Sequence, residues 1–402
     1  MGECIETLRP AGLEVAVRLH DAPRLGEALR TALPGWPCAL ESETAGRELR
    51  VWRDGGDYHR AAYGEIPSSR CSGVAEATCG LIADLIPEAL AARPEAVGLH
   101  AAAVEVDGRL VVFPATHRAG KSLLCASFAA AGYRVFADDV LLLMPDGQGM
   151  ALGIAPRLRL PLPEGLPAEL MDFLAAHLGV RDARYGYLTP GAGRLAAHGE
   201  RRPIAAIVMP DRQPGLEAPS LTPLSSGKGL MRLLAQCLAG DDRDPAARLE
   251  RLLPILRERP CRLLRYDQPL AALQAVVTGM TDAPPEVSPH PQAGLAPTPA
   301  AEPSGIGASA TATVWRRSPV AAEVPLGDEL FLVDDAGGVH ACSALAAAIW
   351  RLLGLETLSG DEIVALLAAR FPEVERGRLV ADVSALFEGL AACRLVAAVE
   401  AA

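Results

Sequence analysis

The chain has 402 residues, 50% of them hydrophobic, and a formal net charge of −11. At about 100–200 residues per domain, this length predicts two or three domains with sizeable cores. The acidic balance disfavours nucleic-acid binding, and no apolar run reaches the roughly 18 residues that a membrane span needs.

Cysteine and lysine usage add two constraints. The nine cysteines are dispersed without a Cys-x-x-Cys pair, which predicts reduced core thiols and a cytoplasmic location. The N-terminal segment has neither the basic nor the apolar region of a secretory signal, so we expect no signal peptide. Of 38 basic residues, only Lys121 and Lys228 are lysines. Because lysine offers a compact charge that the arginine fork does not reproduce, both are candidate functional residues.

The first 281 residues divide into two predicted regions. Residues 1–90 mix short apolar runs with turns and predict a small α+β region in which we recognise no chemistry. Residues 91–281 predict an α/β catalytic domain that begins with two strands joined by the turn Asp107-Gly108. A phosphate-loop motif and a helix ending near Gly132 follow. The strands expected here are Ala101–Val106, Leu110–Phe113, Arg134–Ala137, Val140–Met144, Ile204–Met209 and Cys261–Tyr266, with a further helix at Lys228–Leu238.

The phosphate loop, residues 115–122, fits the pattern G-x-x-x-x-G-K-[ST] except that Ala115 replaces the first glycine. In such a loop, backbone N–H groups ahead of a helix surround phosphates, lysine reaches the β- and γ-phosphates, and the next hydroxyl holds Mg²⁺. A strand before the loop and a helix after it support a nucleotide site; the alternative is a helix start without a ligand. The expected nucleotide-binding residues are Ala115, Thr116, His117, Arg118, Ala119, Gly120, Lys121 and Ser122.

Two adjacent carboxylates, Asp138 and Asp139, end the strand that follows the helix. Neighbouring residues of a strand point to opposite faces, so the two side chains can take different roles. The pair predicts a metal contact from one carboxylate and a base for the acceptor hydroxyl from the other. The alternative is a solvated turn at a strand end.

Residues 99–140 resemble the catalytic core of bacterial HPr kinase/phosphorylases. The resemblance is carried by His100, the phosphate loop, Gly132-Tyr133-Arg134 and Ala137-Asp138-Asp139. It implies that Lys121 contacts the phosphates of ATP, that Ser122 holds Mg²⁺, that Asp139 is the general base toward a serine hydroxyl, and that His100 lines the site.

The resemblance is incomplete beyond this core. The family's later Mg²⁺-binding glutamate has no clear counterpart, although Glu164 lies at a suitable distance. The motif that supports the phosphorylase reaction is not recognisable, so we do not expect reversal of the kinase reaction. Lys228 is either a second phosphate or substrate contact or an exposed residue at a helix start.

Residues 282–310 are dense in Pro, Ala, Gly and Ser and predict a flexible linker. The C-terminal module, residues 311–402, regains periodicity. Strands are expected at Val320–Pro325, Glu329–Val333 and Val339–Ala341, and helices at 343–353, 359–370 and 376–392. The apolar faces expected on the first and last of these helices are Ala344, Ala347, Ala348 and Leu352, and Leu379, Val383, Leu386 and Leu390.

The C-terminal module resembles the PqqD family of peptide-recognition elements. The resemblance is carried by residues 332–353, with an Ala-Ala-x-Ile-Trp run, and by residues 358–372 and 382–396. It implies a small winged-helix-like domain that binds a precursor's leader peptide as an added strand on its sheet edge. The alternative is a winged-helix domain with a structural role. DNA binding is disfavoured, because seven Arg face thirteen Asp plus Glu in this module, a balance of −6.

Together these features predict an α/β, P-loop, HPr-kinase-like catalytic domain flanked by an N-terminal α+β region and a PqqD-like domain. The predicted function is ATP- and Mg²⁺-dependent phosphorylation of a hydroxyl, such as that of serine, on a ribosomally made precursor peptide. Nucleic acid and membrane are not expected partners, and the sequence is compatible with a homo-oligomer. Two alternatives stay open: a nucleotide-binding peptide chaperone without kinase activity, and a regulatory serine kinase of a carrier protein such as HPr.

Overall fold

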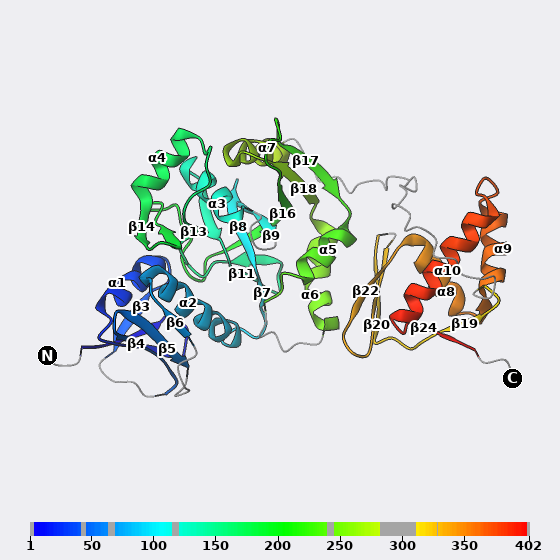
Figure 1. Cartoon of the computed structure of the whole chain (residues 1–402), viewed down its shortest axis with the longest axis horizontal. Helices are drawn as coiled ribbons and strands as arrows, with labels where there is room; N and C mark the ends of the chain where they lie inside the picture. The colour runs from blue at the N-terminus through cyan, green and yellow to red at the C-terminus, as the bar shows by residue number, and fades with distance from the viewer. Residues whose placement is uncertain are drawn as a thin grey trace. The chain divides into compact units, whose positions relative to one another are not determined.

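The computed structural model describes residues 4–41, 46–62, 69–114, 120–238, 245–281, 311–327 and 329–399. Within these ranges the protein is mixed α/β, with several sheets and ten helices. It clusters into two compact units (Figure 1). The first comprises Met1–Arg243 and Arg251–Pro285, and the second Asp244–Glu250 and Glu286–Ala402.

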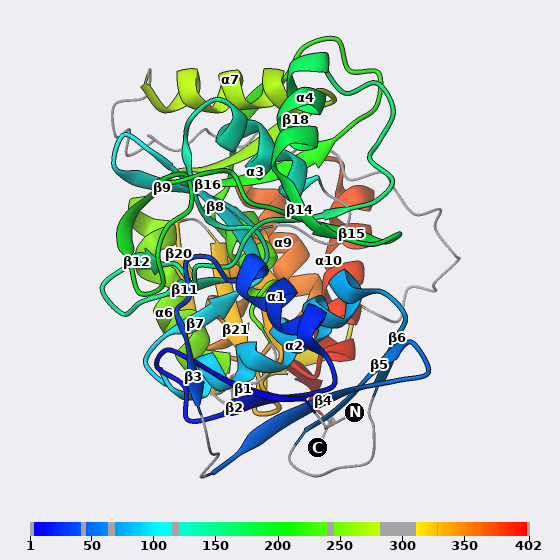
Figure 2. The same ribbon diagram turned by 90° about the vertical axis from the view of Figure 1, so that its left-hand side faces the viewer.

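The N-terminal part of the first unit is a six-stranded sheet in the order β3-β1-β2-β4-β5-β6. Helices α1 and α2 pack side by side on one face of it (Figure 2). The core beneath them also includes Leu142, Leu152 and Tyr187 from later in the chain, so the sheet is not packed in isolation. The elements are β1 (Ile5–Pro10), β2 (Ala16–His20), α1 (Pro23–Ala32), β3 (Cys38–Glu41), β4 (Glu48–Asp54), β5 (Asp57–Ala62), β6 (Ser69–Cys71) and α2 (Val74–Ala91).

A nine-stranded sheet forms the centre of the first unit, with the main order β10-β8-β9-β16-β12-β11-β7, β18 on β16 and β17 on β18. Asp107 and Gly108 both have positive φ, as a tight two-residue hairpin turn requires, and they join β8 to β9 as predicted. The strands are β7 (Val97–Leu99), β8 (Ala101–Val106), β9 (Arg109–Pro114), β10 (Arg134–Ala137), β11 (Leu141–Leu143), β12 (Gln148–Met150), β16 (Arg201–Arg212), β17 (Ser220–Leu224) and β18 (Cys261–Tyr266).

Helix α3 (Lys121–Ala130) follows the predicted phosphate loop and packs on β8 and against α7 (Pro269–Thr281), which in turn packs on β17 and β18. Gly120 precedes α3 with φ of +86°, and a Cβ added there would lie 2.5 Å from the Tyr266 hydroxyl. Both facts require glycine at this position. The remaining elements of the unit are β13 (Arg157–Arg159), α4 (Ala168–His177), β14 (Leu178–Arg181), β15 (Tyr185–Leu188) and α5 (Ser226–Leu234). Helix α6 (Pro245–Glu258) belongs to this unit from Arg251 onward.

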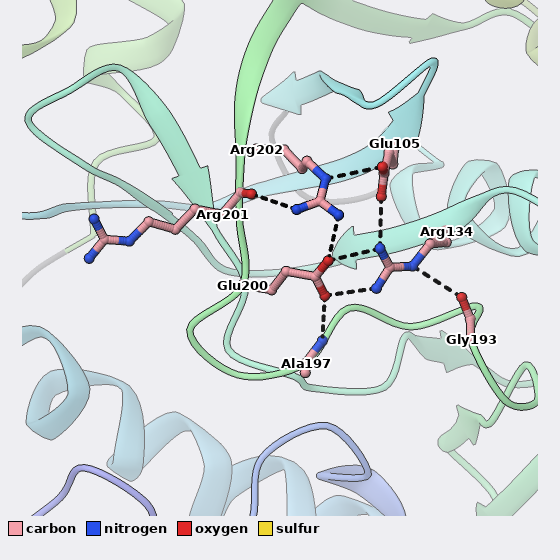
Figure 3. Close-up of polar contacts among 7 residues, drawn as sticks. All are labelled: Glu105, Arg134, Gly193, Ala197, Glu200, Arg201 and Arg202. Atoms are coloured by element: carbon pink, nitrogen blue, oxygen red, sulfur yellow. Dashed lines mark hydrogen bonds and ion pairs between the residues drawn. The ribbon is translucent and has the colours of Figure 1, made fainter.

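Arg134, one of the residues on which the expected resemblance to HPr kinases rests, belongs to a network of ion pairs (Figure 3). Its guanidinium contacts Glu105 at 3.0 Å and Glu200 at 2.7 Å, and Arg202 contacts the same two carboxylates. Both guanidinium groups also lie over the ring of Phe136. The network joins β8, β10 and the start of β16, which gives Arg134 a structural role in this sheet.

The second unit contains two small sheets and three helices. The sheet order β20-β21-β22 is an antiparallel meander, and β23-β19-β24 is a second antiparallel sheet. A capping box, in which Ser359 and Glu362 satisfy each other's backbone N–H groups, begins α9. The elements are β19 (Val314–Arg317), β20 (Ala322–Leu326), β21 (Glu329–Val333), β22 (Val339–Cys342), α8 (Ala344–Leu353), β23 (Leu358–Ser359), α9 (Gly360–Arg370), α10 (Arg376–Ala392) and β24 (Val396–Ala398).

The predicted buried face of α8 is wrong at two positions. Ala344 and Ala348 are exposed, whereas Ala347 is buried as predicted and Leu352 is partly buried against the core. The helix also buries Ala346, Ile349, Trp350 and Leu353. Because α8 is apolar on almost every side, its sequence pattern does not identify the buried face. The buried face is the one that carries Trp350, whose side chain fills the core. On α10, Leu379, Val383 and Leu390 are buried as predicted, with Phe387 in place of Leu386.

The other whole-chain predictions have mixed outcomes. All nine cysteines are unpaired, but only Cys125, Cys261 and Cys342 are buried, and Cys4 and Cys393 are exposed. The predicted linker, residues 282–310, lies outside the described residues. None of the helices in the described ranges combines the length and hydrophobicity that crossing a membrane requires.

Candidate functional site

Three strands of the central sheet bring the predicted site residues to one edge. β8 is antiparallel to both β9 and β10, so β9 and β10 run in the same direction. The end of β9, after which the phosphate loop is predicted, and the end of β10, which the two aspartates follow, therefore lie at the same side of the sheet. Ala101 pairs with Pro114, which places His100, just before β8, at that edge too.

Lys121 and His100 meet at this edge. Lys121 is the first residue of α3, and only 7% of its surface is exposed. Its Nζ lies 3.2 Å from His100 Nε2, and the same imidazole nitrogen lies 3.6 Å from Asp139 Oδ1. Burial lowers the pKa of Lys121, and the charges of Asp139 and Asp138 oppose this effect. The ammonium is therefore held in a dry position next to two carboxylates.

Asp138 is buried and only partly satisfied. Its Oδ2 accepts hydrogen bonds from Ser122 Oγ at 3.0 Å and from the backbone N–H of Arg157 at 2.9 Å. Its Oδ1 is also buried but makes no hydrogen bond within the described part of the chain. Burial, followed by repulsion from Asp139, raises the pKa of Asp138 to about 7. A buried carboxylate oxygen without a donor costs free energy unless a proton or a cation occupies it.

This arrangement fits Mg²⁺. The ion prefers oxygen ligands and commonly binds through one or two carboxylates, waters and substrate phosphates. Ser122 and Asp138 supply a hydroxyl and a carboxylate that already contact each other. No cluster of three or more His, Cys, Asp or Glu side chains suited to a metal occurs among the described residues.

Asp139 has a different environment from its neighbour. Its side chain is 39% exposed, and its Oδ2 accepts a hydrogen bond of 2.8 Å from Arg157 Nη2. Burial acts to raise the pKa of Asp139, but hydrogen bonding to His100 and the charge of Arg157 outweigh it and lower the pKa. Two adjacent carboxylates with pKa values moved in opposite directions are a recurring feature of catalytic sites.

Arg157 is a site residue that the sequence did not reveal. Its backbone N–H holds Asp138, its guanidinium holds Asp139, and Nη1 lies 2.6 Å from the Cys79 sulfur on α2. The guanidinium also lies 4.7 Å from the centre of the Tyr185 ring. In a chain where nearly every basic residue is arginine, no local pattern distinguishes this one.

The other predicted site residues lie in different places. Gly120 and Ser122 lie at the edge as expected, whereas positions 115–119 of the phosphate loop fall outside the described residues. Glu164 is exposed in a turn between β13 and α4. Lys228 is exposed in the first turn of α5, where its backbone N–H is capped by Ser225. The structural interpretation of Lys228 as a helix-start residue agrees with this position.

The C-terminal module offers two outer strands, and they differ as templates for an added strand. β20 contains Pro325, which has no N–H to donate, whereas β22 has no proline. The N–H of Asp334 donates to the carbonyl of Gly338 beside the β21–β22 turn. Alternation along an antiparallel pair then directs the backbone groups of Val339 and Ala341 away from β21, toward the outer edge.

Comparison with known proteins supports the C-terminal part of the predicted architecture. Residues 329–396 match the family model described as Coenzyme PQQ synthesis protein D (PqqD). The match spans the meander from β21 onward and the three helices, and it confirms the PqqD-like part of the prediction. No curated protein matches the chain. The HPr-kinase-like part stays a prediction.

Proposed function

We propose that the first unit transfers the γ-phosphoryl group of ATP to a hydroxyl, such as that of serine, on a precursor peptide captured by the C-terminal module. The observation that carries this proposal is the meeting of Lys121, Ser122, Asp138 and Asp139 at one sheet edge, where Asp138 Oδ1 is buried without a partner among the described residues. Phosphoryl transfer depends mainly on positioning and charge neutralisation, and these side chains supply both.

Each side chain has a defined part in the proposed reaction. Bound Mg²⁺, held by Ser122, Asp138 and the phosphates, would neutralise phosphate charge. Lys121 adds a positive charge close by. The acceptor oxygen forms a bond to the γ-phosphorus while the bond from that phosphorus to the β–γ bridging oxygen breaks and ADP leaves. Asp139, kept ionised by His100 and Arg157, takes the hydroxyl proton.

The C-terminal module would raise the local concentration of the peptide. Similarity to PqqD supports capture of a leader peptide, and strand addition is a common way in which a sheet edge binds an extended peptide. The edge formed by β22 suits this role better than β20, since Val339 and Ala341 direct their backbone groups outward. When a flexible linker joins two binding domains, a ligand held by one domain meets the other in an intramolecular encounter.

The chain's only two lysines provide a matched test. We would incubate the full-length protein with Mg²⁺, ATP labelled at the γ-phosphate and a candidate precursor peptide, and follow label on the peptide. Lys121→Ala should lower transfer by about 10²–10³-fold, because one charge-stabilising contact to the transition state is lost. Lys228→Ala, an equal change at an exposed helix start, should leave transfer unchanged.

A peptide chaperone without kinase activity is the second candidate, favoured by the PqqD match because that match concerns the peptide-binding part alone. Nucleotide binding that depends on Lys121, with no label on any leader-bearing peptide, would select it. Equal transfer by the Lys121→Ala variant and the wild-type protein would refute the phosphate-loop assignment.

A further inference from the structure

A cavity of about 310 Å³ opens beside the two aspartates, within the first unit. His100, Asp139 and Arg157 line its polar end. His100 links the cavity to the phosphate loop, because its Nε2 lies 3.2 Å from Lys121 Nζ. A molecule in the cavity would therefore have its polar group next to the residue proposed as the base.

The rest of the lining is apolar and comes from distant parts of the chain. Helix α2 contributes Ile82 and Ile86, and the segment after β12 contributes Leu152 and Ile154. Ile82 and Ile86 are each 8% exposed, so they are packed in place. The N-terminal region, in which the sequence showed no chemistry, thus supplies one wall of the space beside Asp139.

The charges around the cavity select against an anionic occupant. Arg157 is the one permanent cation among the lining residues, and its guanidinium is already engaged with Asp139, the Cys79 sulfur and the Tyr185 ring. An anionic group would meet two carboxylates with no unengaged arginine to balance it. Desolvating a charge in such a space is unfavourable, whereas an aliphatic group gains from leaving water.

We propose that this cavity is the acceptor subsite, and that it takes an uncharged aliphatic side chain adjacent in the peptide to the hydroxyl that is phosphorylated. The inference rests on the proposed kinase function and adds its substrate class. The volume is at the lower end of the range for ligand pockets, which suits one side chain better than a large cofactor. The hydroxyl lies at the Asp139 end, and the aliphatic group lies against α2.

The subsite can be tested with short peptides and one pair of matched variants. The probes are hexapeptides in which a single serine is flanked on both sides by leucine, by alanine or by aspartate. Ala83→Phe places a large ring at an exposed position of α2 that lines the cavity. Ala91→Phe makes the same change at another exposed position of α2 that does not line it.

Burying a side chain the size of leucine corresponds to about ten- to a hundred-fold in affinity. We expect the wild-type protein and Ala91→Phe to show a KM at least ten-fold lower for the leucine peptide than for the alanine peptide, with the aspartate peptide weakest. Ala83→Phe should remove this preference, while nucleotide affinity and Tm stay unchanged. Equal KM values for the leucine and alanine peptides in the wild-type protein, or an undiminished preference in Ala83→Phe, would overturn the subsite.

A binding measurement separates failure of this inference from failure of the proposed function. If neither these peptides nor a leader-bearing precursor is phosphorylated, the kinase proposal fails, and the hexapeptides are titrated against the protein saturated with a non-hydrolysable ATP analogue. A leucine preference that Ala83→Phe removes and Ala91→Phe keeps would still support an aliphatic subsite. Equal binding of all three peptides would refute it.

Discussion

Replacing Asp138 by asparagine should stabilise the metal-free protein at alkaline pH, although the residue is proposed to bind the metal. Burial and the nearby charge of Asp139 raise the pKa of Asp138 from the ordinary value of 3.8 to about 7. A group whose pKa is raised on folding favours the folded state below its unfolded pKa, and this contribution is lost as the pH rises through the folded pKa. Above pH 7 the wild-type protein therefore holds an ionised carboxylate in an unfavourable place.

The size of the effect follows from the two pKa values. Their difference corresponds to about 4 kcal/mol at a pH well above 7. The asparagine amide keeps an oxygen that can accept from Ser122 and from the backbone N–H of Arg157, but its NH₂ group is buried with a penalty of about 1–3 kcal/mol. A net gain of about 2 kcal/mol remains, or about 4–8 °C in Tm for a unit of this size.

The assay is thermal unfolding in EDTA at several pH values, comparing Asp138→Asn with the wild-type protein. The variant should have the higher Tm at pH 8, and the difference should vanish or reverse at pH 5.5, where Asp138 is already protonated. Asp139→Asn is the control, because the pKa of Asp139 is lowered and its ionised form is paired with Arg157 and His100. That variant should be less stable than wild type throughout this range. A Tm difference for Asp138→Asn that does not change with pH would refute the reasoning.

Three further outcomes are expected. Asp139→Asn should bind nucleotide within a few-fold of wild type but lose most transfer, as single-turnover kinetics would show; a larger loss in Asp138→Asn with little effect of Asp139→Asn would reverse the two roles. A protein truncated after residue 282 should fold and bind nucleotide, yet need on the order of 10² times more leader-bearing peptide for half-maximal transfer; unchanged kinetics would make the tail a structural appendage. In the isolated fragment 311–402, Ala341→Pro should weaken leader binding measured by calorimetry, because it removes a donor on the outer side of β22; unaltered affinity would place the peptide elsewhere.

Local patterns predicted the central strands of residues 91–281 well. Strands β8 and β18 lie at the predicted positions, and β9 extends the predicted strand by one residue at each end. The positive φ at Asp107 and Gly108 reflects the hairpin that these residue types favour. These features depend on residues close together in sequence, such as the alternation of a strand or the chemistry of a turn. The same local reasoning found Ser122 and Asp138, which the structure joins by a hydrogen bond.

Long-range packing accounts for what the sequence did not predict. Arg157 contacts the aspartates and Cys79, which are far from it in the chain, and nothing in its neighbours distinguishes it from other arginines. The part of the cavity wall that α2 forms was not predicted either, because its isoleucines have the sequence pattern of ordinary core residues. On α8, several faces are apolar, and tertiary packing around Trp350 determines which of them is buried.

Arg157 connects these separate observations into one arrangement. Without a nearby cation, two adjacent carboxylates would repel each other, and the pKa values of both would rise. Of the two carboxylates, Asp139 is the one that accepts a hydrogen bond from the guanidinium. His100 and Arg157 lower the pKa of Asp139, and the charge retained there then adds to the effect of burial on Asp138. These two neighbours thus make the adjacent carboxylates chemically different. Through Cys79 the Arg157 side chain also contacts α2, which lines the cavity, so the position of the proposed base and the shape of the proposed acceptor subsite depend on a common residue.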